Sequence, residues 1–291
     1  MGEFYALLCA IIWAFAVILI KKSMEIVSPY ALNLYRVCVA SILLLITVAI
    51  TGDLFWKGTR EDYLLLALSG ILSIAISDTL FHFCLDYVGA SVAAIIDCFY
   101  SPFVVITAYI LLDEKLTPLK IFGMLLVMSA AVLAIYKRGE GGQHLPGQRP
   151  MLGLLLGVLA MLTIAIGVVI AKPVLERSPI LWATTIRQLV SALVLLLFTL
   201  GMPRRKQIFA IFRPSRAWLV AFPATLCASY LGLLFWLASM KYTEAGISAI
   251  ISQTSTIFVL ILASIFFKER ITKRKLVAVL LAFSGIVLVS L

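Results

Sequence analysis

Long apolar runs are the feature that most constrains this chain. A run of about 18 or more apolar residues is long enough to cross the hydrocarbon core of a bilayer as an α-helix. Ten apolar runs follow one another with short polar gaps, at 4–20, 30–50, 63–84, 91–112, 118–136, 151–171, 180–200, 217–238, 247–267 and 274–291. We therefore predict an all-α polytopic membrane protein with ten transmembrane helices.

The composition agrees with this prediction. Hydrophobic residues make up 63% of the chain and charged residues 13%, with a mean hydropathy of +1.11. Soluble globular chains contain about 45–50% apolar and about 25% charged residues. The first run carries Glu3 and lacks a basic segment before it, so we expect a first transmembrane helix there and not a cleaved signal peptide. The expected location is the cell (plasma or inner) membrane, with lipids as neighbours.

The net charge of +10 does not indicate a nucleic-acid partner. The basic residues lie in the gaps between apolar runs, as in "RRKQIFAIFRPSR" and "KERITKRK", where they would meet lipid headgroups. A basic face interleaved with aromatic residues, which nucleic-acid binding favours, does not occur. We predict no nucleic-acid binding.

The cysteines predict no metal site and no disulfide framework. They lie inside apolar runs, lack CxxC spacing and are typical of small core residues: Cys9, Cys38, Cys84, Cys98 and Cys227. We also predict no cofactor.

The chain contains an internal duplication. "ILLDEKLT" (110–117) resembles "IFFKERIT" (265–272), and "DYVGASVAAII" (86–96) resembles "KYTEAGISAII" (241–251), both 155 residues apart. "SPYALNLYR" and "SPILWATTIR" also match, in the same order along the chain. A polar stretch rich in Gly and Pro separates five runs from five. We predict a first five-helix repeat at 1–137, a linker at 138–150 and a second repeat at 151–291.

Five is an odd number, so a tandem second copy must enter the membrane from the opposite face. The two halves are then related by a pseudo-two-fold axis in the membrane plane. Inverted repeats of this kind allow secondary transporters to open a shared site to each side in turn. The sequence therefore predicts two inverted five-helix repeats around a central site.

Several motifs together resemble the drug/metabolite transporter superfamily, and specifically the ten-helix EamA-type transporters of bacteria and archaea. They are Trp13 in the first run, the Ser-Pro…Arg entry to the second and seventh runs, the Tyr-x-x-Ala opening of the fourth and ninth runs, and the "DEKLT" and "KERIT" corners. The resemblance implies transport of small organic solutes and no enzymatic activity. One departure is Ile257 where family members often carry Pro, so we expect a helix break near Pro102 in the fourth run only.

Ionisable residues inside apolar runs mark candidate functional positions, because a charged group at a helix centre costs roughly 2.5–3.5 kcal/mol to insert. Asp78 and His82 are four residues apart, on one helical face, and their chemistry suits proton coupling. The alternative is that they only satisfy each other inside the bundle. Leu233 and Leu237 replace them in the second copy.

Asp97 is the strongest candidate for contact with a solute. It shares a helical face with Ser101, and Pro102 leaves a backbone carbonyl without its usual donor. Ser252 and Gln253 hold the equivalent positions in the ninth run. These residues predict a central polar site, and the alternative is that Asp97 is buried against Arg36 or Arg187.

Charged residues at matching positions of the two halves are predicted to have structural roles. Arg36 and Arg187 lie seven or eight residues past their prolines, about 10–12 Å deep, from where an arginine can reach the interface. We predict an anchor or an ion pair for each, with contact to an anionic solute as the alternative. Glu114 and Glu269, at the matching corners, are further candidates for ion pairs.

Aromatic residues and a glycine motif allow further predictions. Trp13, Tyr100 and Trp236 lie deep enough to wall a cavity for a planar or cationic solute, or they pack helices. Trp182 and Tyr30 are typical of an interfacial belt. The GxxxG motif at 153–157 favours close helix packing and makes a homodimer possible.

The orientation in the membrane is left open by two conflicting indications. With an inside N-terminus, seven Lys and Arg residues would face the cytoplasm and fifteen the other side. The positive-inside rule therefore favours outside termini. The family resemblance implies cytoplasmic termini.

The expected function is secondary transport of a small organic metabolite, by export of amino acids or related amines with proton coupling. One alternative is a lipid or lipid-carrier flippase of the same fold. An intramembrane enzyme is a further alternative, although no HExxH or GxSxG motif occurs. No Walker A sequence occurs either, so this chain alone is not an ATP-driven pump.

Overall fold

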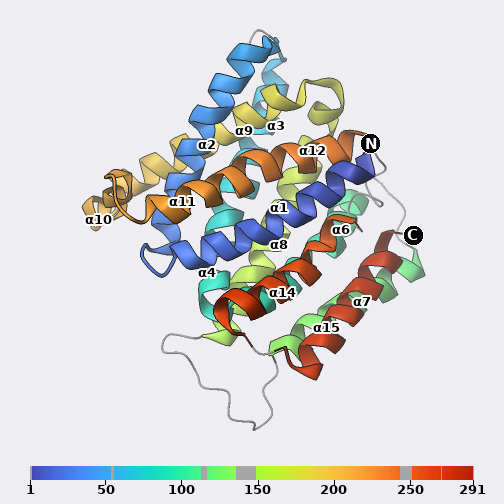
Figure 1. Cartoon of the computed structure of the whole chain (residues 1–291). Helices are drawn as coiled ribbons and strands as arrows, with labels where there is room; N and C mark the ends of the chain where they lie inside the picture. Colours follow the sequence, from blue (N-terminus) through green and yellow to red (C-terminus); the bar gives the residue numbers. More distant parts are fainter. Residues whose placement is uncertain are drawn as a thin grey trace.

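The computed structural model describes residues 2–53, 56–112, 117–135, 149–242, 251–269 and 271–290. The described residues form a bundle of helices and contain no β-strand (Figure 1). Glu114 and residues 138–148 of the predicted linker lie outside these ranges.

Helices coincide with each of the ten predicted runs. Those of the first half are α1 (Gly2–Ser23), α2 (Pro29–Thr51), α3 (Arg60–Gly70), the π-helix η2 (Ile71–Ile76), α4 (Ser77–Val88), α5 (Ala90–Asp97), α6 (Tyr100–Leu112) and α7 (Pro118–Ile135). Those of the second half are α8 (Pro150–Arg177), α9 (Ile180–Leu200), α10 (Arg205–Phe209), the 3₁₀-helix η3 (Ala210–Phe212), α11 (Trp218–Thr225), the π-helix η4 (Leu226–Gly232), α12 (Leu233–Tyr242), α14 (Ser255–Phe267) and α15 (Lys273–Ser290).

Most of these helices are suited to a membrane by length and composition. Among the described residues, seven helical stretches are long and apolar enough to cross a bilayer, and two more apolar helices, Pro118–Ala130 and Ile251–Phe267, are shorter. The chain is therefore an all-helical polytopic membrane protein, as the apolar runs indicate. The number of ten crossings stays a prediction.

The repeated Ser-Pro pairs begin a helix in each half. Ser28 caps α2, because its hydroxyl accepts a hydrogen bond from the Ala31 N–H at 3.4 Å, and Pro29 takes the first helical position. Pro179 directly precedes α9. Proline suits a helix start, where its missing N–H would have no helical partner.

Large apolar side chains cover the outside of the bundle. Ile50 is 80% exposed and Leu219 is 77% exposed. A soluble monomer rarely exposes so much contiguous apolar surface, whereas a bilayer requires it. The five cysteines are free and buried or half-buried, as the sequence predicts.

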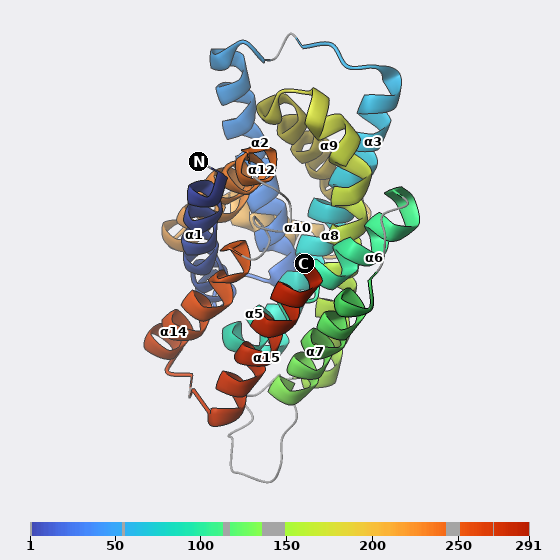
Figure 2. The same cartoon turned by 90° about the vertical axis from the view of Figure 1, so that its right-hand side faces the viewer.

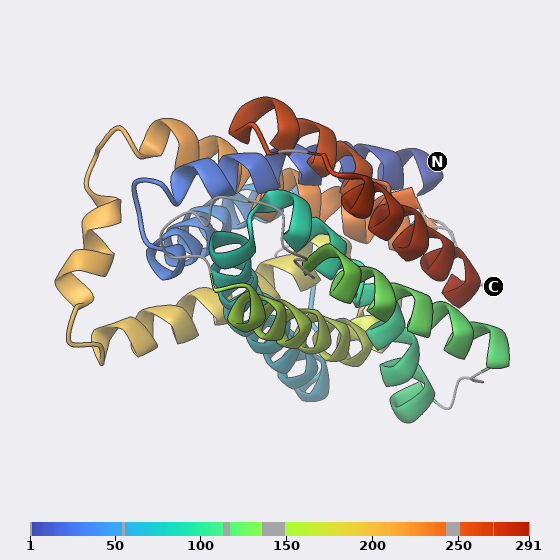
Figure 3. The same cartoon turned by 90° about the horizontal axis from the view of Figure 1, so that it is seen from below.

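Two helices pack mainly against each other at the edge of the bundle. α7 and α15 lie side by side along one flank (Figure 2). Viewed from below, the connection with α10 and η3 lies at the edge opposite the start of α1 and the end of α15 (Figure 3). The remaining long helices surround the centre of the molecule.

One sequence-based interpretation is wrong. Trp182 is only 3% exposed, and the centroid of its ring lies 4.4 Å from that of Trp56, so it packs in an aromatic cluster and does not face lipid headgroups. The prediction that the GxxxG motif favours close helix packing is confirmed, because added Cβ atoms at Gly153 and Gly157 would meet Tyr87, Val88, Cys84 and Ile96. The homodimer stays a prediction.

Glu269 connects the two halves at the start of α5. Its carboxylate accepts hydrogen bonds from the backbone N–H groups of Ala90, at 3.0 Å, and Ser91, at 3.3 Å. It also pairs with the Lys275 ammonium at 3.1 Å. Gly89, with a φ of 82°, has no side chain that could cap this helix, so Glu269 supplies the cap from the other half of the chain.

We expect Glu269→Gln to lower stability by about 1 kcal/mol at neutral pH, as for the loss of a helix cap. Burial raises the pKa of Glu269, but the hydrogen bonds from Ser91, Lys275 and Ala90 outweigh burial and hold the pKa below its usual value. The native chain should therefore keep this contribution above the unfolded pKa of about 4.3 and lose it as the pH falls through the folded pKa.

Thermal unfolding in detergent between pH 7 and pH 3.5 measures this effect. The loss of stability toward acid should be smaller in Glu269→Gln than in the native chain. Glu25→Gln, at an exposed position between α1 and α2, is the matched control and should change neither value. Equal pH profiles for the native chain and Glu269→Gln would contradict the role of this cap.

Candidate functional site

A cavity lies between the two halves, and eight of the ten runs contribute to its wall. Its volume is about 960 Å³, including space open at its mouth. α7 and α15 do not line it. The lining residues are Cys9, Trp13, Arg36, Ser73, Ile74, Asp78, Asp97, Tyr100, Met161, Ile164, Arg187, Gln188, Ala228, Ser229, Gly232, Leu233, Trp236, Ser252, Gln253 and Ser255.

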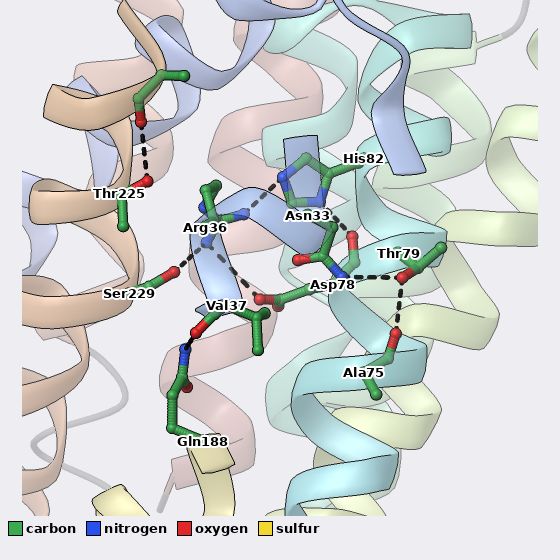
Figure 4. A network of polar contacts seen from close by, with 11 residues as sticks. Asn33, Arg36, Val37, Ala75, Asp78, Thr79, His82, Gln188, Thr225 and Ser229 are labelled. Atoms are coloured by element: carbon green, nitrogen blue, oxygen red, sulfur yellow. Dashed lines mark hydrogen bonds and ion pairs between the residues drawn. The ribbon is translucent and has the colours of Figure 1, made fainter. Parts of the chain in front are cut away.

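Arg36 is held by partners from both halves (Figure 4). Its guanidinium donates to His82 Nε2 at 2.5 Å and to Ser229 Oγ at 2.8 Å, and it lies 3.6 Å from the Asp78 carboxylate. Only 2% of Arg36 is exposed. Of the two roles predicted for Arg36, the anchor at the membrane interface is wrong and the ion pair is confirmed, because Arg36 is buried against the Asp78 carboxylate.

The contacts of His82 determine its tautomer. The Arg36 guanidinium has only donors, so His82 Nε2 accepts. His82 Nδ1 then carries the hydrogen and donates to the backbone carbonyl of Asp78. His82 is therefore neutral here. Asp78 and His82 do share one helical face, but their side chains meet through Arg36 and not directly.

Arg187 occupies the matching place in the second half with far fewer partners. It is 1% exposed, so it does not reach the interface either, and its Nη2 donates to Ser73 Oγ at 2.8 Å. Its Nε and Nη1 are buried without a hydrogen-bond partner. Among the described residues, no carboxylate forms an ion pair with Arg187.

Each arginine forms a hydrogen bond to a serine of the other half of the chain. Arg36 of the first half bonds to Ser229 in η4, and Arg187 of the second half bonds to Ser73 in η2. The π-helices η2 and η4 begin 155 residues apart, the same separation as the repeated motifs. π-Helical turns are rare and are frequent at functional sites.

Asp97 faces the cavity at the end of α5 without a cation beside it. The Trp13 indole lines the same cavity. In the described part of the chain, no Lys, Arg or His forms an ion pair with Asp97. The alternative that Asp97 is buried against Arg36 or Arg187 is therefore wrong. Tyr100 and Trp236 complete an aromatic wall, with ring centroids 6.2 Å apart.

Helix breaks place polar groups in this cavity from both halves. The fourth run is interrupted at Cys98 and Phe99, between α5 and α6, next to Pro102. The ninth run is also interrupted, at Thr254, where the Thr254 N–H bonds to the Ile251 carbonyl at 3.1 Å. The expectation of a break in the first half only is wrong, because a tight turn forms here without proline.

The structure brings most of the predicted site residues together. Those that line the cavity are Asp97, Gln253, Trp13, Tyr100, Trp236, Asp78, Arg36 and Arg187. Ser101 is buried and does not line it, and His82 lies behind Arg36. Glu269 is in the α14–α15 connection, and Glu114 lies outside the described residues.

Sequence reasoning missed the two serines that the arginines contact. Ser73 and Ser229 lie in "ILSIAIS" and "LCASYLG", which contain no charged residue and no proline. A π-helical turn has no composition signature, so nothing in these stretches singles out one serine. The equal spacing of the two stretches from their repeat motifs is the one signal that could have found them.

The comparison with family models gives the identity of this architecture. The model described as the EamA-like transporter family matches residues 1–136 and 151–291. The chain belongs to the EamA-like transporter family. This confirms the resemblance to the drug/metabolite transporter superfamily that its motifs indicate.

Relatives of this EamA-like transporter carry similar names. An "uncharacterized transporter" of Archaeoglobus fulgidus is 26% identical over 287 residues, which is 98% of this chain and 96% of the relative. The "uncharacterized transporter YetK" of Bacillus subtilis is 27% identical over 138 residues, which is 45% of this chain and 39% of the relative. Family and relatives support a membrane transporter and not an enzyme.

A solved crystal structure has the same fold as this EamA-like transporter. It superposes with a TM-score of 0.68 and covers 99% of this chain and 95% of its own, at 15% sequence identity. At this identity the likeness concerns the fold alone.

Proposed function

We propose that this EamA-like transporter is a secondary active transporter of a small organic metabolite in the cell membrane. The proposed activity is export of an amino acid or a related amine by alternating access. The cavity between the halves carries the proposal, because it joins buried charges to an aromatic wall inside a bundle of membrane-spanning helices. Sites of this composition suit a solute that is both polar and apolar.

The proposal includes two inverted repeats, at 1–137 and 151–291, with ten membrane crossings and a linker at 138–150. The crossed contacts of Arg36 and Arg187, and the equal spacing of η2 and η4, support it. Each crossed contact joins the two halves. A rocking of one half against the other therefore changes both contacts, which provides the two arrangements that alternating access requires.

Asp97 is the proposed contact for the cationic part of the solute. Its carboxylate faces the cavity and forms no ion pair with a described cation, and Trp13, Tyr100 and Trp236 line the same cavity. An ammonium gains both from a carboxylate and from the faces of aromatic rings, and more so away from water. A solute amine therefore fits this part of the wall.

A proton is the proposed coupling ion, with Asp78 and His82 as the responsive pair. Asp78 faces the guanidinium of Arg36, and His82 accepts a hydrogen bond from it. Protonation of either group would remove an acceptor or a negative charge from Arg36. The contact between Arg36 and Ser229 in the other half would then be free to rearrange.

Counterflow into liposomes tests the proposed function. Purified protein in vesicles preloaded with unlabelled L-amino acids and amines should accumulate the radiolabelled compounds from outside, and empty vesicles should not. A pH gradient across the vesicle should increase the accumulation. Movement of fluorescent phospholipids between leaflets, with no solute counterflow, would replace the proposal by a lipid flippase.

A further inference from the structure

Arg36 and Arg187, at matching positions of the two halves, differ in the number of their hydrogen-bond and ion-pair partners. Arg36 has Asp78, His82 and Ser229 as partners. Arg187 has Ser73, and its Nε and Nη1 remain buried and unpaired at the cavity wall. A buried guanidinium without an anion is costly, because neither water nor a partner replaces the hydration that it loses. The second half therefore carries a buried positive charge, on Arg187, that no described acidic residue neutralises.

The acidic residues of the cavity do not neutralise the charge of Arg187. Asp78 interacts electrostatically with both arginines, but its ion pair is with Arg36. Two guanidiniums and one carboxylate leave an excess positive charge on this side of the cavity. Asp97 supplies a negative charge elsewhere on the wall and forms no ion pair with a described cation.

Tyr100 lines the same cavity as Arg187 and Asp97, and its hydroxyl is buried without a hydrogen-bond partner. On the ninth run, Gln253 Oε1 is a buried acceptor that lacks a donor. The cavity wall therefore carries unpaired donors on Arg187 and Tyr100 and an unpaired acceptor on Gln253, and the Asp97 carboxylate on the same wall forms no ion pair with a described cation.

We propose that Arg187 and Tyr100 form a carboxylate subsite for the transported solute. The inference rests on the proposed function and narrows its substrate class to a zwitterion. An α-amino acid places its carboxylate against the unpaired Nη1 of Arg187 and the second N–H of the adjacent Nη2, and its ammonium toward Asp97 and Gln253. Arginine suits this role, because its planar fork meets a carboxylate with two parallel hydrogen bonds. A simple amine leaves Arg187 unpaired.

Binding of matched molecules to the purified protein in detergent tests this subsite. The twenty common L-amino acids are ranked by dissociation constant, and the tightest is compared with the amine that lacks its carboxylate. For leucine this amine is 3-methylbutylamine. We expect the amino acid to bind at least about 10-fold tighter than the amine, as for a charge-assisted hydrogen bond. Equal affinities, or no binding by any of the twenty, would overturn the proposal.

Variants of the subsite provide a second measurement. Arg187→Gln should bring the affinity for the amino acid to that of the amine and leave the affinity for the amine unreduced. The affinity of Arg187→Lys for the amino acid should lie between those of the native chain and Arg187→Gln. Tyr100→Phe should lower the affinity for the amino acid a few-fold. Arg177→Gln, whose arginine is 52% exposed and paired with Asp62 away from the cavity, is the matched control and should change neither affinity. Native affinity for the amino acid in both Arg187 variants would overturn the subsite.

The two proposals fail in different ways. Counterflow of an amino acid with no dependence on Arg187 would overturn the carboxylate subsite and leave the transporter standing. Arg187-dependent binding of an amino acid without counterflow would support the subsite and remove the transport proposal.

Discussion

Asp97→Asn is expected to lower counterflow of an amine or amino acid by at least about 30-fold at solute concentrations well below saturation. Removing one member of a buried charge pair typically costs 2–5 kcal/mol, and each 1.4 kcal/mol corresponds to a factor of ten. Asp97 has no protein cation to compensate among the described residues, so its charge is available to a solute. Asn has nearly the same shape as Asp, so the fold should persist.

The assay for Asp97→Asn uses equal amounts of native and variant protein in the same liposomes. Asp86→Asn is the matched control, because Asp86 is paired with Lys21 at the end of α4, outside the cavity. It should transport as the native chain does. Asp97→Glu keeps the charge and should lose less than Asp97→Asn. Native transport by Asp97→Asn, with an unchanged thermal midpoint, would remove Asp97 from the solute site.

Much of the site could be predicted from the sequence because membrane helices constrain polar residues strongly. A polar group in an apolar run must face the interior of the bundle or a cavity. Asp97, Gln253 and Arg187 come from three different runs, and each obeys this rule by lining one cavity. The repeat helps further, since Gln253 follows the position that matches Asp97.

The depth and partners of the arginines could not be predicted in the same way. Counting residues from Pro29 places Arg36 within reach of the interface. Its actual environment comes from α4 and η4, which supply Asp78, His82 and Ser229. These contacts depend on how neighbouring helices are rotated, and a helix that is apolar all round carries no signal of rotation.

Irregular backbone and close helix packing could not be predicted from the sequence either. Thr254 interrupts the ninth run without Pro or Gly beside it. Gly70 lies so close to the Arg187 carbonyl that an added Cβ would clash, which shows how tightly α3 meets α9 near the cavity. Close packing of this kind is decided by tertiary contacts, and the sequence shows only that a small residue is present.

Arg36→Met is expected to lower the free energy of unfolding by about 3–5 kcal/mol, the usual effect of breaking a buried ion pair. The substitution leaves Asp78 without its cation, and His82 Nε2 and Ser229 Oγ without their donor (Figure 4). Met fills a similar volume, so the loss should come from unpaired polar groups and not from an empty space. Unfolding by SDS in mixed micelles measures it.

The double variant Arg36→Met with Asp78→Asn tests the cause. Most of the loss should come from an uncompensated carboxylate, so removing its charge as well should restore part of the stability. A double variant as unstable as the sum of the two single variants would show that Asp78 and Arg36 are not coupled.

Arg187→Met is the matched comparison in the second half of the chain. Arg187 has Ser73 and two unpaired nitrogens, so replacing it removes a buried charge that the protein does not neutralise. We expect this variant to be neutral or more stable than the native chain without solute, in contrast to Arg36→Met. Equal destabilisation by the two substitutions would mean that both arginines are structural, and that the cavity holds no cation reserved for a solute.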